Sequence, residues 1–199
     1  SGTRGSGTVF FSRCTLRCLY CQNYPWSQQG RGEPYEGPQL AGVFRSLRDS
    51  GCHNLNLVSP TPWLPMIVEA LRDANSGSDS LPVVYNTSGY ERVETLARLE
   101  GLATVFLTDL RYAEEESALE GSGARGYVKA AREALLEMWR QTGPMRLDAD
   151  GIAVSGTICR LLILPGRAEE AVANLEWLVR EIGTGIAVSV MAQYWPAHR

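Results

Sequence analysis

Short runs of β-branched and aromatic residues alternate with longer stretches of helical period along this chain. The short runs predict six strands, over residues 8–12, 55–59, 83–86, 104–108, 157–164 and 186–191. Between the strands, apolar residues recur at the i, i+3, i+4, i+7 spacing of an amphipathic helix. Because strands that alternate with helices form parallel sheets with helical crossovers, the pattern predicts an α/β fold built from βα units.

Four apolar stripes carry the helical spacing, and each predicts the buried face of a helix. They are Leu40, Val43, Phe44 and Leu47; Leu64, Ile67, Val68 and Leu71; Val128, Ala131, Leu135, Met138 and Trp139; and Val172, Leu175, Leu178, Val179 and Ile182. The segment 22–38 is rich in glycine, proline and aromatic residues and predicts a long loop after the first strand. Segments 75–80 and 114–126 are expected to be surface connections.

Length and composition limit the classes of protein to consider. With 199 residues, of which 44% are hydrophobic, the chain can bury the core of one domain spanning residues 1–199. Its net charge of −3 offers no broad cationic surface, so neither nucleic acid nor anionic lipid is expected as a partner. The absence of an apolar run of about 18 residues, or of a signal-peptide core over residues 1–8, predicts a cytoplasmic protein rather than a membrane or secreted one.

The five cysteines are unevenly distributed, and three of them, Cys14, Cys18 and Cys21, form a CxxxCxxC sequence directly after the first predicted strand. Because the number of cysteines is odd and three of them lie close together, the pattern argues against disulfides and favours a metal or redox site. Three thiolates on one loop can hold three irons of a [4Fe-4S] cluster and leave the fourth iron open. A zinc site and three unrelated structural cysteines are the alternatives, although neither histidine stands at zinc-finger spacing. Cys52 and Cys159 are isolated, which favours simple packing.

A series of motifs accompanies the cysteines in order along the chain: GSGTVFFSRCTLRCLYCQNY, HNLNLVSPTPW, VVYNTSGYE, VFLTDLRY, CRLLILPG and VMAQYWP. The series resembles the radical S-adenosylmethionine (SAM) superfamily, with aromatic Tyr20 before the third cysteine. More narrowly, it resembles the subfamily of pyruvate formate-lyase activating enzymes. The resemblance implies a partial (β/α)6 TIM-like barrel. Whether this barrel is truncated at both ends is a question that the resemblance does not decide. Its [4Fe-4S] cluster, held by the three cysteines, and its SAM would lie at the carboxyl ends of the strands.

The resemblance also assigns a cofactor pocket to polar residues at the first strand ends. Ser59 and Thr61 stand where the superfamily's glycine-rich loop binds the methionine amino group, although the usual Gly-Gly-Glu is missing. Thr61, followed by Pro62, is equally suited to cap a helix. Asn86 and Ser88 resemble residues that contact the ribose or methionine end of the cofactor, and a turn-forming role is the alternative.

Further polar residues of the implied pocket follow later strands. Asp109 and Arg111 match an Asp-Leu-Lys motif, and Arg111 is expected to bind a carboxylate or a substrate anion; a plain surface ion pair is the alternative. Arg160 is an inward-pointing charge in an apolar strand that needs a partner, for which the cofactor carboxylate is one candidate. Gln193 and Tyr194 would complete the pocket wall, or pack at its edge.

The activity implied by the resemblance is reductive cleavage of SAM by the cluster, which generates a 5′-deoxyadenosyl radical for hydrogen abstraction. An electron donor such as flavodoxin or ferredoxin would supply the cluster. The substrate would be a glycine of a partner protein, with another peptide or a small molecule as alternatives. A non-catalytic iron–sulfur protein that transfers electrons or senses oxidants is the rival, but such proteins normally saturate their cluster with four ligands.

Overall fold

The computed structural model describes residues 2–74, 80–192, 194–195 and 197–198 of the chain. The strands are β1 (Gly7–Phe10), β2 (Leu55–Val58), β3 (Val83–Thr87), β4 (Val105–Asp109), β5 (Arg146–Leu147), β6 (Ala153–Leu162) and β7 (Ala187–Met191). The helices are α1 (Tyr24–Ser27), α2 (Gly37–Asp49), the 3-10 helix η1 (Thr61–Trp63), α3 (Leu64–Ala74), α4 (Val93–Ala97), α5 (Glu115–Ser122), α6 (Tyr127–Thr142) and α7 (Ala168–Glu181). All six predicted strands are therefore confirmed.

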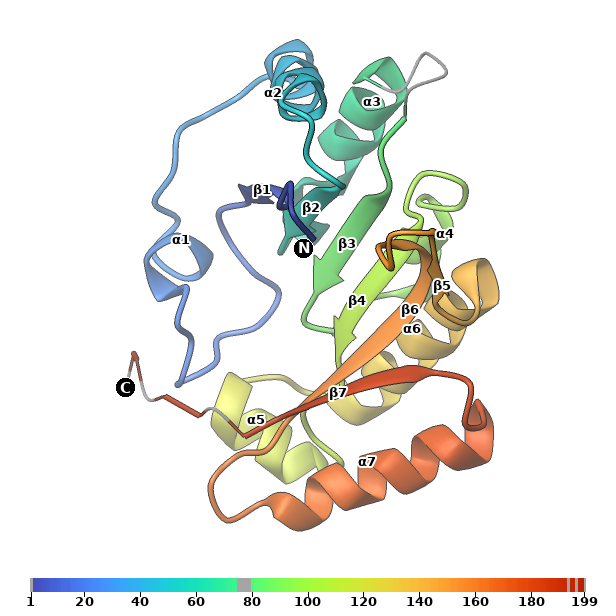
Figure 1. Cartoon of the computed structure of the whole chain (residues 1–199). Coiled ribbons are helices and arrows are strands. Elements are labelled where there is room, and N and C mark those ends of the chain that lie inside the picture. Colours follow the sequence, from blue (N-terminus) through green and yellow to red (C-terminus); the bar gives the residue numbers. More distant parts are fainter. Residues whose placement is uncertain (1, 75–79, 193, 196, 199) are drawn as a thin grey trace.

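The strands form one sheet whose parallel members follow the order β1-β2-β3-β4-β6-β7 (Figure 1). The two-residue β5, which the sequence pattern did not predict, pairs antiparallel with the start of β6. Among the described residues β1 pairs only with β2, and β7 only with β6, so the sheet does not close. An open sheet of six parallel strands with helical crossovers confirms the predicted partial (β/α)6 barrel.

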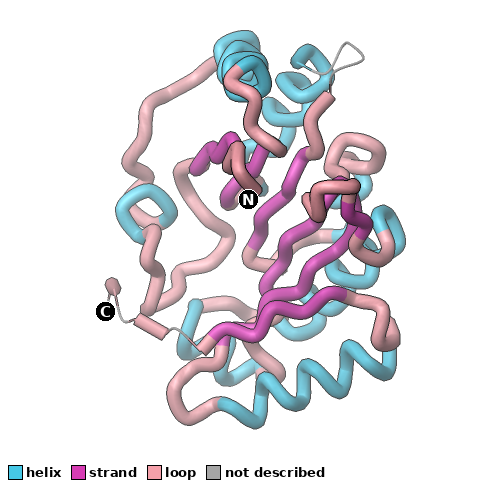
Figure 2. Tube along the Cα trace, in the orientation of Figure 1, coloured by secondary structure: helices cyan, strands magenta, loops and turns pink. Residues whose placement is uncertain are grey.

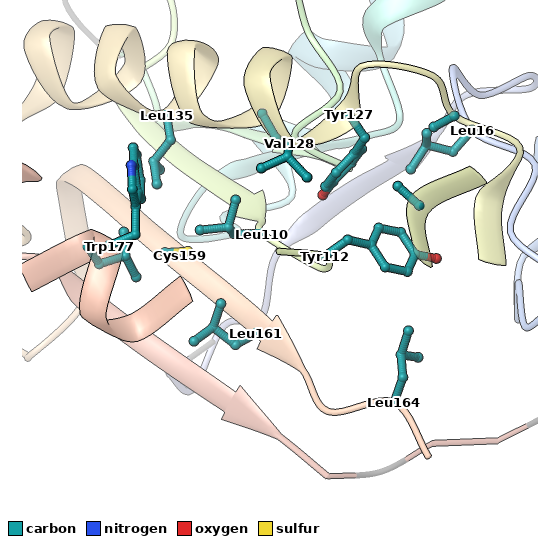
Figure 3. Packing of buried hydrophobic residues seen from close by; sticks show 14 of the residues in the cluster. Leu16, Leu110, Tyr112, Tyr127, Val128, Leu135, Cys159, Leu161, Leu164 and Trp177 are labelled. Carbon is teal, nitrogen blue, oxygen red and sulfur yellow. The ribbon is translucent and has the colours of Figure 1, made fainter. Parts of the chain in front are cut away.

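The helices cover the outer side of the curved sheet and bury its apolar residues (Figures 1 and 2). One cluster packs Phe44 of α2 and Ile67 of α3 against Leu57 of β2. A second packs Leu135 of α6 and Trp177 of α7 with other buried residues, as Figure 3 shows. The long connection that carries α1 leaves β1, arcs away from the sheet and returns to α2 (Figure 1).

Two sequence predictions about helices are corrected. Segment 114–126 is not a mere surface connection, because it contains α5, whose Ser117, Ala118 and Ser122 are buried. In α7 the predicted stripe is wrong at Val172 and Val179, which are 54% and 56% exposed. That helix instead buries a face shifted by about one position, made of Ala171, Asn174, Trp177 and Leu178. Bulky Trp177 decides the orientation, since it buries more area than a valine.

In the described part of the chain, no helix combines the length and the apolar character that crossing a bilayer requires.

Candidate functional site

The cysteine loop begins at the carboxyl end of β1 and is held in place from two sides. Arg13 adopts a left-handed conformation (φ 73°), and its N–H donates to the Trp26 carbonyl at 2.9 Å, which ties the loop to the α1 segment. On the other side, the N–H groups of Arg17 and Leu19 donate to carbonyls of Ser122 and Gly121 at 3.0 Å each. The helix missed in the sequence therefore positions the metal-ligand candidates.

Each predicted cysteine ligand has a different hydrogen-bond environment. The buried Cys18 Sγ accepts from Arg111 Nη1 at 2.9 Å and from Ser122 Oγ at 3.0 Å. Cys14 Sγ accepts a long bond from the Leu16 N–H at 3.5 Å. Cys21 Sγ lies 3.1 Å from the Ser27 hydroxyl. Two donors, one of them a cation, therefore converge on Cys18 alone among the three.

The three thiols are close enough to affect one another. Burial raises the pKa of the Cys14 thiol; the Leu16 N–H and Arg111 lower it, while Cys18 and Cys21 raise it. Yet no group of three or more His, Cys, Asp or Glu side chains in the described ranges is close enough to bind a single metal ion. The three cysteines nevertheless lie near one another on one loop.

A charged network joins the ends of β3, β4 and β6 to this loop. The Asp109 carboxylate accepts from Arg160 Nε at 2.6 Å through Oδ1 and from Arg111 Nη2 at 2.5 Å through Oδ2. Arg160 Nη2 also donates to Asn86 Oδ1 at 2.9 Å. Asp109 and Arg160 are direct partners in the register of β4 and β6, which explains their pairing. Since Arg111 also reaches Cys18, the network runs from Asn86 to a cysteine sulfur.

The network answers two questions that the sequence left open. Arg160 has a protein partner, Asp109, so its charge is compensated without a cofactor. The Arg111–Asp109 pair is an ion pair at the rim of the core, with side chains 20% and 6% exposed, and not a fully exposed surface pair. Burial acts to lower the pKa of Arg111, but the Asp109 and Cys18 charges raise it well above its ordinary value. The guanidinium therefore remains a cation.

A second polar cluster lies after β2 and β3, around Glu91, which the sequence analysis did not single out. The Thr61 hydroxyl donates to Glu91 Oε1 at 2.5 Å, and the Thr87 hydroxyl donates to the same oxygen. Tyr85 donates to Thr61 at 3.1 Å. The helix-cap alternative for Thr61 is wrong, because Pro60 is the N-cap of η1 and the Thr61 side chain bonds to Glu91 instead.

The remaining predicted pocket residues are spread around these two clusters. Ser59 is left-handed (φ 54°), and its N–H donates to the Asn86 carbonyl at 2.9 Å, so the β2 and β3 ends are linked. Ser88 lies 3.3 Å from the hydroxyl of Thr15 in the cysteine loop. Tyr20 points inward, with its hydroxyl 2.7 Å from that of Tyr112. Gln193 lies outside the described residues.

Comparison with known proteins identifies the fold. No family model matches the chain. An uncharacterized protein of Methanocaldococcus jannaschii is 26% identical over 203 residues, a match that covers 98% of this chain and 55% of that protein. Methylornithine synthase (PylB) is similar in structure, with a TM-score of 0.59, 15% identity and coverage of 94% of this chain and 53% of the other. The [FeFe]-hydrogenase maturase HydG from Carboxydothermus hydrogenoformans has a TM-score of 0.63, 16% identity and coverage of 94% and 44%.

Both solved structures share the parallel α/β architecture of this chain. The fold of this chain is the partial TIM-like barrel that its sequence motifs imply for a radical SAM core. The chain spans about half the length of the proteins that it matches. At these identities the likeness concerns the fold alone, so the chemistry rests on the residues of this chain.

The cysteine loop fits the cluster of the radical SAM fold. A four-iron cluster binds each cysteine through a separate iron, and the three thiols of this loop are neighbours. Hydrogen bonds to cysteine sulfur are typical surroundings of such clusters, and Cys18 receives two. The donor set is all sulfur, which is the ligand type that iron–sulfur clusters select.

Proposed function

We propose that this chain is the core of a radical SAM enzyme, which binds a [4Fe-4S] cluster through Cys14, Cys18 and Cys21. The observation that carries the proposal is the position of these thiols on one loop after β1, joined by hydrogen bonds to the polar ends of β3, β4 and β6. A site built only to transfer electrons has no need of polar groups from several strand ends. When bound, the reduced cluster would supply the one electron that breaks the C5′–S bond of SAM, which would give methionine and a 5′-deoxyadenosyl radical able to abstract a hydrogen atom from a substrate.

The protein's part in this reaction is to bind and orient. Arg160 and Asn86 bond to each other at the strand ends, and we assign this pair to the cofactor's polar groups on the strength of the motif resemblance. Asp109 holds Arg160 and Arg111 in fixed directions, because it bonds both. Ser59, Thr61, Ser88, Tyr20 and Gln193 complete the proposed pocket on the strength of the motif resemblance.

The substrate that we favour is a glycine Cα–H of a partner protein, as for the activating enzymes that the motifs resemble. Large aromatic side chains near the cysteine loop support a protein partner, since Phe10 is 53% and Tyr35 48% exposed. They border a cleft of about 600 Å³ that is lined by β1, α2 and the connection that carries α1. Another peptide or a small molecule is the alternative. A peptide deuterated at glycine Cα that transfers deuterium to 5′-deoxyadenosine would support the first choice.

The proposed electron donor is a flavodoxin or ferredoxin, and the proposed compartment is the cytoplasm. All five cysteines are free thiols, which a reducing compartment preserves.

The deciding experiment is anaerobic reconstitution with iron and sulfide, followed by addition of SAM and a reductant. We expect one four-iron cluster per chain, and formation of 5′-deoxyadenosine and methionine even without substrate. Changing Cys14, Cys18 or Cys21 to Ala should abolish cluster binding, because a three-cysteine site has no spare ligand. The measurements are iron and sulfide content and chromatographic detection of the products.

Cys52→Ala and Cys159→Ala are the matched controls, because both thiols are buried and neither belongs to the CxxxCxxC sequence. Both variants should retain the cluster. Tight binding of stoichiometric zinc with no uptake of iron would refute the proposal, whereas a cluster that never cleaves SAM would favour the electron-transfer alternative.

A further inference from the structure

Cys18 differs from the other two predicted ligands in the number and charge of its hydrogen-bond donors. The Arg111 guanidinium donates through Nη1 at 2.9 Å, and the Ser122 hydroxyl donates at 3.0 Å from α5. Arg111 is itself fixed by Asp109, so its charge stands at a set place beside the sulfur. We propose that Arg111 and Ser122 are positioning residues that raise the reduction potential of the cluster through the Cys18 sulfur, an inference that rests on the proposed function.

The Ser122 hydroxyl is kept pointing at the sulfur by a buried chain of hydroxyl groups. Tyr20 and Tyr112 lie 2.7 Å apart, and Tyr112 lies 2.6 Å from Ser122. Burial raises the pKa of Tyr112 well above its ordinary value, so the phenol keeps its proton and can donate. Ser122 has one proton to donate, and with Tyr112 supplying a donor this proton is directed to Cys18. Each bond of such a chain strengthens the next.

The sign of the effect follows from electrostatics. Reduction adds one electron to the cluster, and part of that negative charge resides on the thiolate sulfurs. A cation and a hydroxyl donor stabilise the more negative state more than the oxidised one, and little water competes in a buried site. Loss of either donor should therefore make reduction harder. Arg111 was expected from the sequence to bind a substrate anion, but two of its nitrogen atoms are already engaged by Asp109 and a third by Cys18.

The test is a potentiometric titration of the reconstituted protein, followed by electron paramagnetic resonance of the reduced cluster. In Arg111→Gln we expect a midpoint lower by about 59 mV, a tenfold smaller ratio of reduced to oxidised cluster at a fixed potential. Ser122→Ala should shift the midpoint in the same direction by less, because it removes a neutral donor. Arg111→Lys keeps the positive charge but loses the planar guanidinium that donates to Asp109 and Cys18 together. Its midpoint potential should therefore lie between those of the wild type and Arg111→Gln.

Matched controls separate this effect from general damage. Ser117→Ala removes a buried hydroxyl from the same helix that bonds to Arg167 and not to a cysteine. Arg132→Gln removes a partly buried arginine that packs over Trp177. Both should leave the midpoint unchanged.

Iron content distinguishes failure of this inference from failure of the proposed function. Wild-type protein that takes up no cluster would overturn both. Full cluster content with an unchanged midpoint in Ser122→Ala and Arg111→Gln would overturn only the role of these donors. If Arg111→Gln does not fold, the midpoint potentials of Ser122→Ala and Arg111→Lys test the inference, because each of these variants changes the hydrogen-bond donors to Cys18 more conservatively.

Discussion

Glu91 is a buried carboxyl of this site whose ionisation is changed by folding. Burial raises the pKa of its carboxyl from 4.5 to about 7, although the hydroxyls of Thr61 and Thr87 lower it. Its Oε2 atom has no hydrogen-bond partner among the described residues. Because the native state holds this proton more tightly than the unfolded state, the contribution of Glu91 to stability is present below pH 4.5. It is lost as the pH rises through about 7.

We therefore predict that Glu91→Gln removes part of the pH dependence of stability. Between about pH 4.5 and 7 the wild-type free energy of unfolding should lose about 3 kcal/mol through Glu91, at about 1.4 kcal/mol per pKa unit. A neutral amide has no such loss. Urea unfolding at pH 5 and pH 8 measures the difference, with the exposed Glu94→Gln as control. Equal pH slopes in wild type and Glu91→Gln would contradict the assignment.

At the scale of residues, the sequence indicates the cysteine motif because its chemistry is local. Cys14, Cys18 and Cys21 are recognisable by spacing alone. Glu91 and Ser122 are not, because each gains its role from a partner far along the chain, at Thr61 and Cys18. The pairing of Asp109 with Arg160 likewise depends on a strand register that spacing does not encode.

Among the elements, the turn after β3 depends on Gly89. Its φ is +81°, and a Cβ there would lie 2.2 Å from the Asp109 carbonyl oxygen, so the turn passes directly against the end of β4. Gly89→Ala should lower the free energy of unfolding by more than about 2 kcal/mol, since it adds a clash to the backbone strain. Thermal unfolding measures it.

Gly101→Ala is the matched control for that substitution. Gly101 has a similar φ of +75°, but no atom lies within 4 Å of its added Cβ. The Gly101→Ala substitution should therefore lower the free energy of unfolding only by the backbone strain, about 1 kcal/mol. Equal losses in the two variants would show that the contact with β4 does not matter.

The junction of β4 and β6 depends on the Asp109 carboxylate, which is 6% exposed and compensates two arginines. Asp109→Asn keeps the shape but leaves Arg111 and Arg160 without their counter-ion, and should destabilise the protein by about 3 kcal/mol. The exposed pair of Glu100 and Arg140 is the control, and Glu100→Gln should cost less than about 1 kcal/mol. Denaturant unfolding compares them, and similar losses would contradict a buried ionic junction.

Elements with strong periodicity were predictable, whereas those defined by tertiary contact were not. All six strands and four long helices follow from apolar spacing. Helix α5 was not predicted because the residues of its sequence EESALEGS are mostly polar or small. Its buried face consists largely of serine and alanine, so it has no apolar stripe. The buried face of α7 was predicted wrongly because Val172 and Val179 follow the helical apolar spacing although they are exposed, whereas Trp177 supplies the buried area.

For the whole molecule, the radical SAM fold brings separated motifs to one end of the sheet. The resemblance in sequence and the likeness in structure agree on this architecture, although the chain spans about half the length of its matches. The subfamily and the substrate were not predictable to the same degree, because they depend on surfaces beyond the strand ends. The cleft beside β1 lies at an open edge of the sheet.

The order of the parallel strands has a consequence for how the protein is made. Each of these strands pairs with the parallel strand before it in the sequence, so a chain that leaves the ribosome can add one βα unit at a time to a growing sheet. Asp109 follows the same order, because its partner Arg160 lies in the next parallel strand and emerges 51 residues later. During synthesis the charged network is therefore completed only after β6 has left the ribosome.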